Sequence, residues 1–284
     1  MAKRKFNRCL LIVCEGTKTE HDYFDYITSH VSRPKGIWDN VVICDNKTIP
    51  KDFPIPEPTE LGIRKKRSFV NPNKQNMRER NVLKELCVYL YGEGVGIDEY
   101  ENIKAVPLRY VAQAQLIEEE QRMYEELWAV FDMDGHSHHK QAFERAKKEV
   151  NGKKVQIGFT SRSFEHWILL HFKKNRTQFS SSECKDEKRK SLNFNSEQGC
   201  KGTICLAGYL RSFTPLKNYE KSNSADNLGF MMKLLLDPQC LNSAFANAEW
   251  LRKEIKNDEN LKDKNCYELN PYTDVDILVK KLVE

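Results

Sequence analysis

The sequence predicts an α/β fold, in which a mostly parallel sheet carries helices on both faces and a helical C-terminal subdomain follows. Two observations predict it. Short apolar runs alternate with helix-like stretches over residues 1–175, an order typical of parallel strands joined by crossover helices. From residue 176 onward the apolar spacing becomes mainly helical. We therefore expect an α/β domain over 1–175 and a mainly helical region over 176–284.

Short apolar runs without a helical stripe mark the predicted strands. The expected strands are 9–14, 41–44, 103–110, 127–132 and 154–159. Apolar residues at helical spacing mark the helices between them. These are expected over 18–30, 77–91, 111–125, a stretch through Phe143, Ala146 and Val150, and 163–172. Residues 46–100 begin with a stretch rich in Pro, Lys, Arg and Asn, which predicts an insertion rather than part of the core.

Composition and charge restrict the class of protein. The formal net charge of +5 permits a nucleic-acid partner without requiring one. No apolar run reaches the length of about 18 residues that a transmembrane helix needs, so we expect no membrane partner. The nine cysteines include no C-x-x-C pair, which favours reduced thiols in a cytoplasmic protein over a zinc site.

Carboxylates end two of the apolar runs. Glu15 follows the strand in LLIVCEG, and Asp132 and Asp134 end the run in LWAVFDMDG. The carboxyl ends of parallel strands are where functional groups gather, and a spacing of two places Asp132 and Asp134 on one face of a strand. Carboxylates held together repel unless a cation separates them, and Mg²⁺ and Mn²⁺ prefer such oxygen ligands. We therefore expect these residues to bind Mg²⁺ or Mn²⁺, although D-x-D-G is also a common turn sequence.

Two further acidic residues have both a structural and a functional interpretation. Thr17 and Glu20 have the spacing of a capping box, which explains Glu20 as a helix-terminus residue. Glu165 lies in the first turn of a helix that begins near Ser163, where the helix dipole favours a negative charge. Because that helix starts at the same edge of the sheet, Glu165 is equally a candidate metal ligand.

Three basic residues near these carboxylates are candidates for substrate binding. Lys18 follows Gly16, which would let the chain turn and leave room for a phosphate, but an exposed lysine in a first helical turn explains Lys18 equally well. His136 follows D-x-D-G and is a candidate for contact with substrate or for proton donation, against the simpler explanation of a solvated histidine loop. Arg162 follows the last predicted strand.

Four stretches of the chain, taken in order, resemble the RloB-like family. They are LLIVCEGTKTEHDYF, LWAVFDMDGH, SRSFEHWILLHF and NPYTDVDILVKKL, which together touch nearly the whole chain. A glutamate after the first strand and a D-x-D after a later one also resemble the TOPRIM domain of topoisomerases, primases and OLD family nucleases. The resemblance implies that the sheet is TOPRIM-like.

The resemblance also implies an activity and partners. It implies a Mg²⁺-dependent phosphodiester nuclease of bacterial anti-phage defence, paired with an ABC-type or AAA-type ATPase. Glu15 would be the catalytic acid or base, Asp132 and Asp134 the catalytic metal ligands, and Glu165 a further ligand or organiser. The substrate would be nucleic acid, either DNA or RNA, with transfer RNA among the candidates. A homo-oligomer is compatible with this role.

A second hypothesis makes the chain a catalytically inactive, TOPRIM-like scaffold that binds nucleic acid or a partner protein. Under both hypotheses, we expect the insertion at 46–100 and the helical tail to be docking surfaces, because they are basic and amphipathic. Binding of Mg²⁺ or Mn²⁺ distinguishes the two.

Overall fold

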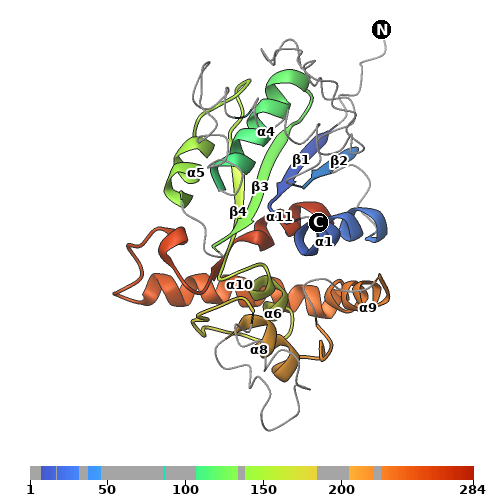
Figure 1. Cartoon of the computed structure of the whole chain (residues 1–284), viewed down its shortest axis with the longest axis vertical. Coiled ribbons are helices and arrows are strands. Elements are labelled where there is room, and N and C mark those ends of the chain that lie inside the picture. Colours follow the sequence, from blue (N-terminus) through green and yellow to red (C-terminus); the bar gives the residue numbers. More distant parts are fainter. Residues whose placement is uncertain are drawn as a thin grey trace, which may run out of the picture. The chain divides into compact units, whose positions relative to one another are not determined.

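The structure is a computed structural model with the α/β fold that the sequence predicts (Figure 1). It describes residues 8–16, 18–31, 38–45, 86, 107–133, 138–183, 205–219 and 225–284, without the side chains of 225–227. The strands are β1 (Cys9–Cys14), β2 (Asn40–Cys44), β3 (Glu126–Asp132), β4 (Val155–Ser161) and β5 (Tyr272–Thr273). The helices are α1 (Thr19–His30), α4 (Pro107–Gln121), α5 (His139–Ala146), α6 (Glu165–Leu170), α8 (Leu206–Phe213), α9 (Ala225–Leu235), α10 (Pro238–Asn257) and α11 (Val275–Val283), with a 3₁₀ turn at Cys266–Glu268.

The five strands form one sheet in the order β2-β1-β3-β4-β5. β1 and β2 pair in parallel, with Leu10 beside Val41. β5 pairs antiparallel with β4, with Thr160 beside Thr273. The sheet is therefore mostly parallel, as predicted, with an antiparallel strand at one edge.

The chain forms two compact units, and each unit is assembled from separated segments. The first contains residues 1–15, 39–129 and 136–157, and the second contains residues 16–38, 130–135 and 158–284. Strands β3 and β4 contribute residues to both units.

In the first unit, the predicted strand over 103–110 is wrong from residue 107 onward, because Pro107 begins helix α4. Proline is favoured at a first helical position, where its missing N–H has no helical partner to lose. The helix predicted over 111–125 is present, but it is buried rather than polar-faced. Its side chains from Pro107 to Glu118 are all buried, and α4 packs on β1 and α5.

The polar residues of α4 are buried because they bind the backbone and charges of neighbouring elements. Gln115 donates from Nε2 to the carbonyl of Arg145 (3.2 Å), in the last turn of α5, and to the carbonyl of Lys148 (3.0 Å), just after that helix. Glu118 is fully buried and accepts from the Lys153 ammonium at 2.6 Å and from the Tyr124 amide at 3.1 Å. A buried polar group with such partners avoids the free-energy cost of desolvation without compensation.

The helix predicted through Val150 ends earlier, at Ala146. Val150 and Lys153 instead exchange two backbone hydrogen bonds, of 2.8 and 3.0 Å, around Asn151 and Gly152. Both central residues have positive φ, 51° and 75°. Asn-Gly is the preferred pair for a tight turn of this kind because both residues tolerate the left-handed conformation.

In the second unit, the helices pack around aromatic side chains. Tyr23 and Phe24 of α1 make edge-to-face contacts with Phe164, with centroid separations of 5.5 and 6.1 Å. Such pairs add to the free energy gained by burying the rings. Trp167, which is fully buried, lies on α6, and α6 packs on both α8 and α10 (Figure 1).

The C-terminal part of the second unit is mainly helical, as predicted, and α10 is its longest helix. The Asp237 carboxylate accepts from the amides of Gln239 (3.0 Å) and Cys240 (3.3 Å) and so caps α10, with Pro238 at the first helical position. The exception is β5, a two-residue strand that the helical pattern of this region does not predict.

The described cysteines are free, and Cys9, Cys14, Cys44 and Cys205 are buried, which confirms the prediction of unbridged thiols for this part of the chain. The insertion at 46–100, with its predicted helix over 77–91, lies outside the described residues apart from Leu86, which is helical and buried.

Among the described helices, none has both the length and the apolar character needed to cross a bilayer.

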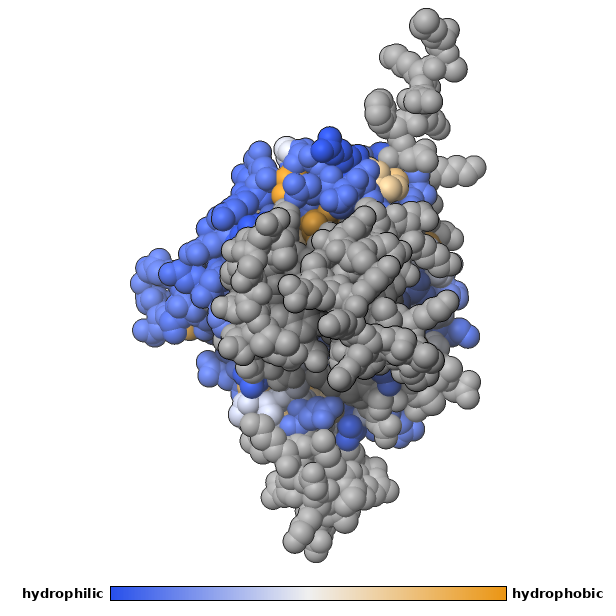
Figure 2. Space-filling model, turned by 45° about the horizontal axis from the view of Figure 1, so that its top comes forward, coloured by the Kyte–Doolittle hydropathy of each residue, from blue (hydrophilic) through white to orange (hydrophobic). Residues whose placement is uncertain are grey.

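The surface of the described residues is mainly hydrophilic in the view of Figure 2. Large apolar side chains that are well exposed are few in the described part of the chain. They are Met123, Ile277, Phe213 and Phe230.

Candidate functional site

Asp132 ends β3, as the sequence predicts, and is only 6% exposed. The amide of the next residue, Met133, donates to the carbonyl of Thr160 at 3.2 Å, which keeps the end of β3 beside β4. A carboxylate at this depth is stable only with hydrogen-bond donors or a cation close by. Asp132 therefore has the position expected of a functional carboxylate at the carboxyl end of a strand.

Glu15 follows β1 directly and is half-buried. It belongs to the first unit, whereas Asp132 belongs to the second. Asp134 and His136 lie outside the described residues. Their expected roles, and the one-face arrangement of Asp132 and Asp134, stay predictions.

The start of α1 differs from the predicted capping box. The helix begins at Thr19, and Lys18 occupies the N-cap position without a side-chain cap, while Thr17 lies outside the described residues. Lys18 is exposed, as its simpler interpretation predicts. A Cβ atom added at Gly16 would lie 1.8 Å from Oε2 of Glu20, and the expected space for a phosphate stays a prediction. The glycine leaves room for the Glu20 carboxylate.

Glu165 is the best-defined carboxylate of the second unit. It begins α6, is 1% exposed, and each of its oxygens accepts a hydrogen bond. Ser163 Oγ donates to Oε2 at 2.6 Å, and the Tyr219 hydroxyl donates to Oε1 at 2.6 Å. Short hydrogen bonds to an ionised acceptor are stronger than neutral ones, so the two hydroxyls hold the carboxylate in one orientation. We call Glu165, Ser163 and Tyr219 the carboxylate–hydroxyl cluster.

The cluster extends to the start of α1 through Tyr219. Burial raises the pKa of the Tyr219 phenol well above its ordinary value, and the negative charge of Glu165 raises it further. The Thr19 hydroxyl and the Glu20 charge also act on this phenol. Tyr219 is therefore a neutral hydrogen-bond donor at physiological pH, and it donates to Glu165.

Sequence reasoning missed Ser163 as a donor and Tyr219 altogether. Ser163 precedes Glu165 by two residues, so its role is visible in the S-x-E spacing. Tyr219 is 54 residues away from Glu165 and lies in a loop without a motif. Only the packing of α8 against α6 brings it near.

Two histidines of α6 and its C-terminal end are part of the core. His166 and His171 are both buried, and burial lowers the pKa of each to about 4. His171 accepts from the Tyr23 hydroxyl at Nε2 (3.2 Å) and donates from Nδ1 to the Trp167 carbonyl (3.0 Å), an arrangement that suits the neutral ring. Neither residue is protonated at neutral pH, so neither serves there as a general acid.

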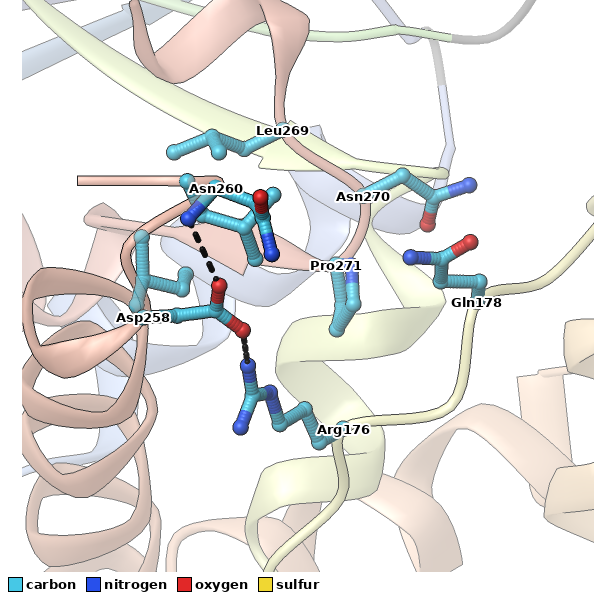
Figure 3. A pocket seen from close by; sticks show the side chains of 9 residues that line it. Arg176, Gln178, Asp258, Asn260, Leu269, Asn270 and Pro271 are labelled. Carbon is cyan, nitrogen blue, oxygen red and sulfur yellow. Dashed lines mark hydrogen bonds and ion pairs between the residues drawn. The ribbon is translucent and has the colours of Figure 1, made fainter. Parts of the chain in front are cut away.

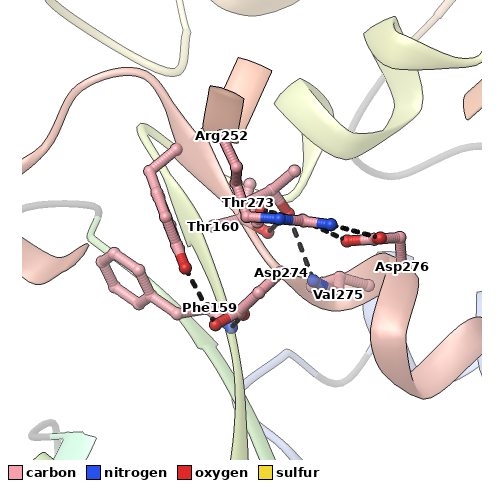
Figure 4. A network of polar contacts seen from close by, with 8 residues as sticks. Phe159, Thr160, Arg252, Thr273, Asp274, Val275 and Asp276 are labelled. Atoms are coloured by element: carbon pink, nitrogen blue, oxygen red, sulfur yellow. Dashed lines mark hydrogen bonds and ion pairs between the residues drawn. The ribbon is translucent and has the colours of Figure 1, made fainter. Parts of the chain in front are cut away.

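A second polar network lies at the tail of the chain (Figure 4). The Asp274 carboxylate accepts from the Phe159 amide of β4 at 2.7 Å and from the Tyr272 hydroxyl at 3.4 Å. Burial raises its pKa to about 7, against the opposing effects of the Phe159 amide and Arg252. This network fixes the antiparallel edge strand.

Next to Asp274, Arg252 of α10 binds Asp276 of α11 with two parallel hydrogen bonds, 2.6 and 2.7 Å long (Figure 4). It also donates to the Thr273 carbonyl at 2.8 Å. Asp276 is 1% exposed, so the guanidinium compensates a buried charge. These contacts join α10 to β5 and to the start of α11, both of which lie in the segment NPYTDVD.

A small pocket of about 170 Å³ adjoins the same motif (Figure 3). Arg176 and Asp258 form an ion pair on one side of it, and Gln178 and Asn270 lie on the other. Asn270 donates from Nδ2 to the Phe179 carbonyl at 3.0 Å, so its Oδ1 is directed away from that carbonyl. Oδ1 is buried without a hydrogen-bond partner among the described residues. Because the Arg176 and Asp258 charges neutralise each other, this pocket suits a small neutral molecule or water.

A divalent cation fits the chemistry of these residues, since buried carboxylate oxygens are the donors that Mg²⁺ and Mn²⁺ take. Asp132 provides such a donor at a strand end, and Glu165 provides another at the start of α6. Within the described residues, which omit Asp134, no group of three His, Cys, Asp or Glu side chains is close enough to hold a metal ion. Arg162, the remaining candidate for substrate binding, follows β4 and is half-buried.

Comparison with known proteins identifies one family. The family model described as RloB-like protein matches residues 10–282, which is nearly the whole chain. No curated protein and no solved structure matches the chain significantly.

Proposed function

The chain belongs to the RloB-like family, and from this premise we propose that it is a metal-dependent nuclease that hydrolyses phosphodiester bonds in nucleic acid. The observation that carries the proposal is the buried Asp132 carboxylate at the carboxyl end of β3. β1, which Glu15 follows, is the neighbour of β3 in the strand order. A TOPRIM-like arrangement of these carboxylates is part of the proposal.

The proposed roles follow from the chemistry of each side chain. Asp132 and Asp134 would hold Mg²⁺ or Mn²⁺, which would supply Lewis-acid stabilisation of charge on the phosphoryl oxygens and activation of water. Glu15 is half-buried, so it is able to exchange a proton with the attacking water or with the leaving oxygen. Lys18, His136 and Arg162 are proposed to contact the anionic substrate.

Glu165 acts in the proposal as an organiser rather than as a proton carrier. Both of its oxygens accept short hydrogen bonds, which fixes their direction. Each oxygen keeps a second lone pair that would be available to a cation. The Tyr219 phenol, which donates to Glu165, is also affected by the Thr19 hydroxyl and the Glu20 charge at the start of α1.

The biological setting is proposed on the family alone. We propose that the protein is the effector of a bacterial anti-phage defence system and that a partner ATPase controls it in the cytoplasm.

The test is hydrolysis by the purified chain. Labelled DNA and a total RNA pool are incubated with Mg²⁺, with Mn²⁺ or with a chelator. We expect cleavage that needs the metal, and we expect Asp132→Asn and Glu15→Gln to reduce the rate by about 10²- to 10⁴-fold. Asp25→Asn, which alters an exposed carboxylate on α1, is the matched control and should cleave like the wild type.

Metal binding measured by calorimetry separates this proposal from an inactive scaffold. Asp132→Asn should weaken Mn²⁺ binding without lowering the unfolding midpoint. If the wild-type chain binds nucleic acid but neither binds Mn²⁺ at millimolar concentration nor cleaves, the scaffold hypothesis replaces the nuclease. Full cleavage by the Asp132→Asn variant would remove that residue from the mechanism.

A further inference from the structure

A second hollow of the surface, of about 240 Å³, lies beside the carboxylate–hydroxyl cluster. Its lining comes from the turn 215–219 and from Phe230 and Met231 of α9. Tyr219 therefore has two roles: its hydroxyl donates to Glu165, and the residue contributes to the wall of this pocket. We call the hollow the Phe230 pocket.

The turn that forms one wall is held in place by its own hydrogen bonds. Thr214 donates to the Leu210 carbonyl at 2.6 Å and accepts from the Leu216 amide at 3.1 Å. Arg211 of α8 donates to the Tyr219 carbonyl. A wall fixed in this way is preformed, so a ligand does not have to order it on binding.

The pocket presents an aromatic ring to solvent. Phe230 is 62% exposed, more than any other large apolar side chain in the described part of the chain. Phe213, at the end of α8, is 50% exposed and packs against Tyr209 with a centroid separation of 4.6 Å. An exposed aromatic side chain beside a hollow indicates a binding site more than an isolated exposed aliphatic side chain does.

Three lysines of the described part of the chain lie near these rings. Lys217 lines the pocket and is exposed, and its ammonium donates to the Ser212 carbonyl at 3.3 Å, which leaves two hydrogens for a ligand. Lys233 is exposed on α9 three residues after Phe230, so the two lie on the same side of the helix. Lys173 lies over the rings of Tyr209 and Phe213, at 5.3 and 5.6 Å.

Aromatic rings interspersed with basic side chains are the means by which proteins bind single-stranded nucleic acid, since bases stack on the rings and phosphates meet the charges. The pocket is smaller than the roughly 300 Å³ typical of sites for drug-sized ligands, which suits one base rather than a whole nucleotide. A base within a duplex is stacked on both faces and does not enter such a pocket. A protein partner would find a small apolar area among lysines.

We propose that the Phe230 pocket binds an unpaired base of a single-stranded nucleic acid, which stacks on Phe230 while Lys217 and Lys233 bind the flanking phosphates. This inference deepens the proposed function and rests on nucleic acid being the substrate. Single-stranded segments, in DNA or RNA, are therefore the substrate class. Tyr219, which orients Glu165, also contributes to the wall of this pocket.

The test is the affinity for fluorescently labelled single-stranded DNA and RNA oligonucleotides, measured by anisotropy with a chelator present so that binding is measured without cleavage. Phe230→Leu keeps an apolar side chain but removes the ring, and should weaken binding about 5- to 100-fold. Phe230→Tyr keeps an aromatic ring at this position and should bind the oligonucleotides with the affinity of the wild type. Lys217→Gln should weaken binding and reduce the slope of log affinity against log salt by about 0.7. Ile277→Ala removes an exposed apolar side chain from α11 and should leave affinity unchanged.

Several results overturn the inference. Equal affinity of Phe230→Leu and the wild type removes stacking, and equal affinity of Phe230→Leu and Phe230→Tyr removes the need for a ring. A change in sedimentation or in assembly with a partner protein, without a change in oligonucleotide affinity, makes the surface a protein-docking site. Loss of cleavage with oligonucleotide binding intact counts against the proposed nuclease only.

Discussion

Removal of the Tyr219 hydroxyl is the most direct test of the carboxylate–hydroxyl cluster. The Tyr219→Phe variant keeps the buried ring and deletes one donor to Glu165, whose Oε1 accepts it at 2.6 Å. The carboxylate is 1% exposed, so water does not readily replace the lost donor. A hydrogen bond to a charged group contributes about 1.5–3 kcal/mol, and we expect the free energy of unfolding to fall by this amount.

The expected loss is measured by urea unfolding, followed by tryptophan fluorescence and circular dichroism. The midpoint should fall while the slope of free energy against urea stays constant, because the folded packing is unchanged. Tyr209→Phe, which alters a half-buried tyrosine of α8, is the matched control and should lie within about 0.5 kcal/mol of the wild type.

A double-mutant cycle assigns the loss to the pair. If Tyr219 stabilises the fold through Glu165, then Tyr219→Phe should cost far less in a Glu165→Gln background than in the wild type, with a coupling energy of at least about 1 kcal/mol. Additive effects in the cycle, or a loss below about 0.5 kcal/mol for Tyr219→Phe alone, would refute the reasoning.

Three further predictions follow from the described contacts. Because burial raises the folded pKa of Asp274 to about 7, its contribution to stability is present at low pH and is lost as the pH rises from about 4 through 7, by at most about 4 kcal/mol. In urea unfolding across this pH range, the Asp274→Asn variant should not show that loss. Parallel pH profiles of stability for the variant and the wild type would contradict this expectation. Arg252→Lys keeps the charge but loses the bidentate geometry toward Asp276, so unfolding should cost about 1.5–3 kcal/mol less, whereas an unchanged midpoint would show that one contact suffices. Gly16→Ala should displace the Glu20 carboxylate, which a crystal structure of the variant would reveal, and an unmoved carboxylate would contradict the space argument.

The part of the fold that the sequence predicts is the part in which local pattern and burial agree. The apolar runs at 9–14, 127–132 and 154–159 became β1, β3 and β4, because fully buried strands need apolar residues on both faces. Helix α4 was misassigned at its start because the apolar run up to residue 110 was predicted as a strand, whereas Pro107 begins the helix. The burial of α4 was also not predicted, because Gln115 and Glu118 are buried through hydrogen bonds to other elements. A polar sequence gives no indication of such burial.

In the candidate site, too, local sequence patterns predict some of the residue positions, and only tertiary packing determines the others. The position of Asp132 at a buried strand end could be predicted, because the apolar run that precedes it is unambiguous. The hydrogen bonds of Glu165 could be predicted only in part, since Ser163 is local and Tyr219 is brought in by the packing of α8 on α6. The two-residue strand β5 is too short for any period-two pattern. Beside its pairing with β4 lies a hydrogen bond from the Phe159 amide to the Asp274 carboxylate, two residues that are far apart in the sequence.

The interleaving of segments has a practical consequence for anyone who wishes to express half of this protein. Since residues 16–38, 130–135 and 158–284 share one unit, no single truncation isolates it, and a fragment that starts at residue 158 lacks α1 and the end of β3. Dissection would require a permuted or relinked gene, and mutational work is better done on the full-length polypeptide.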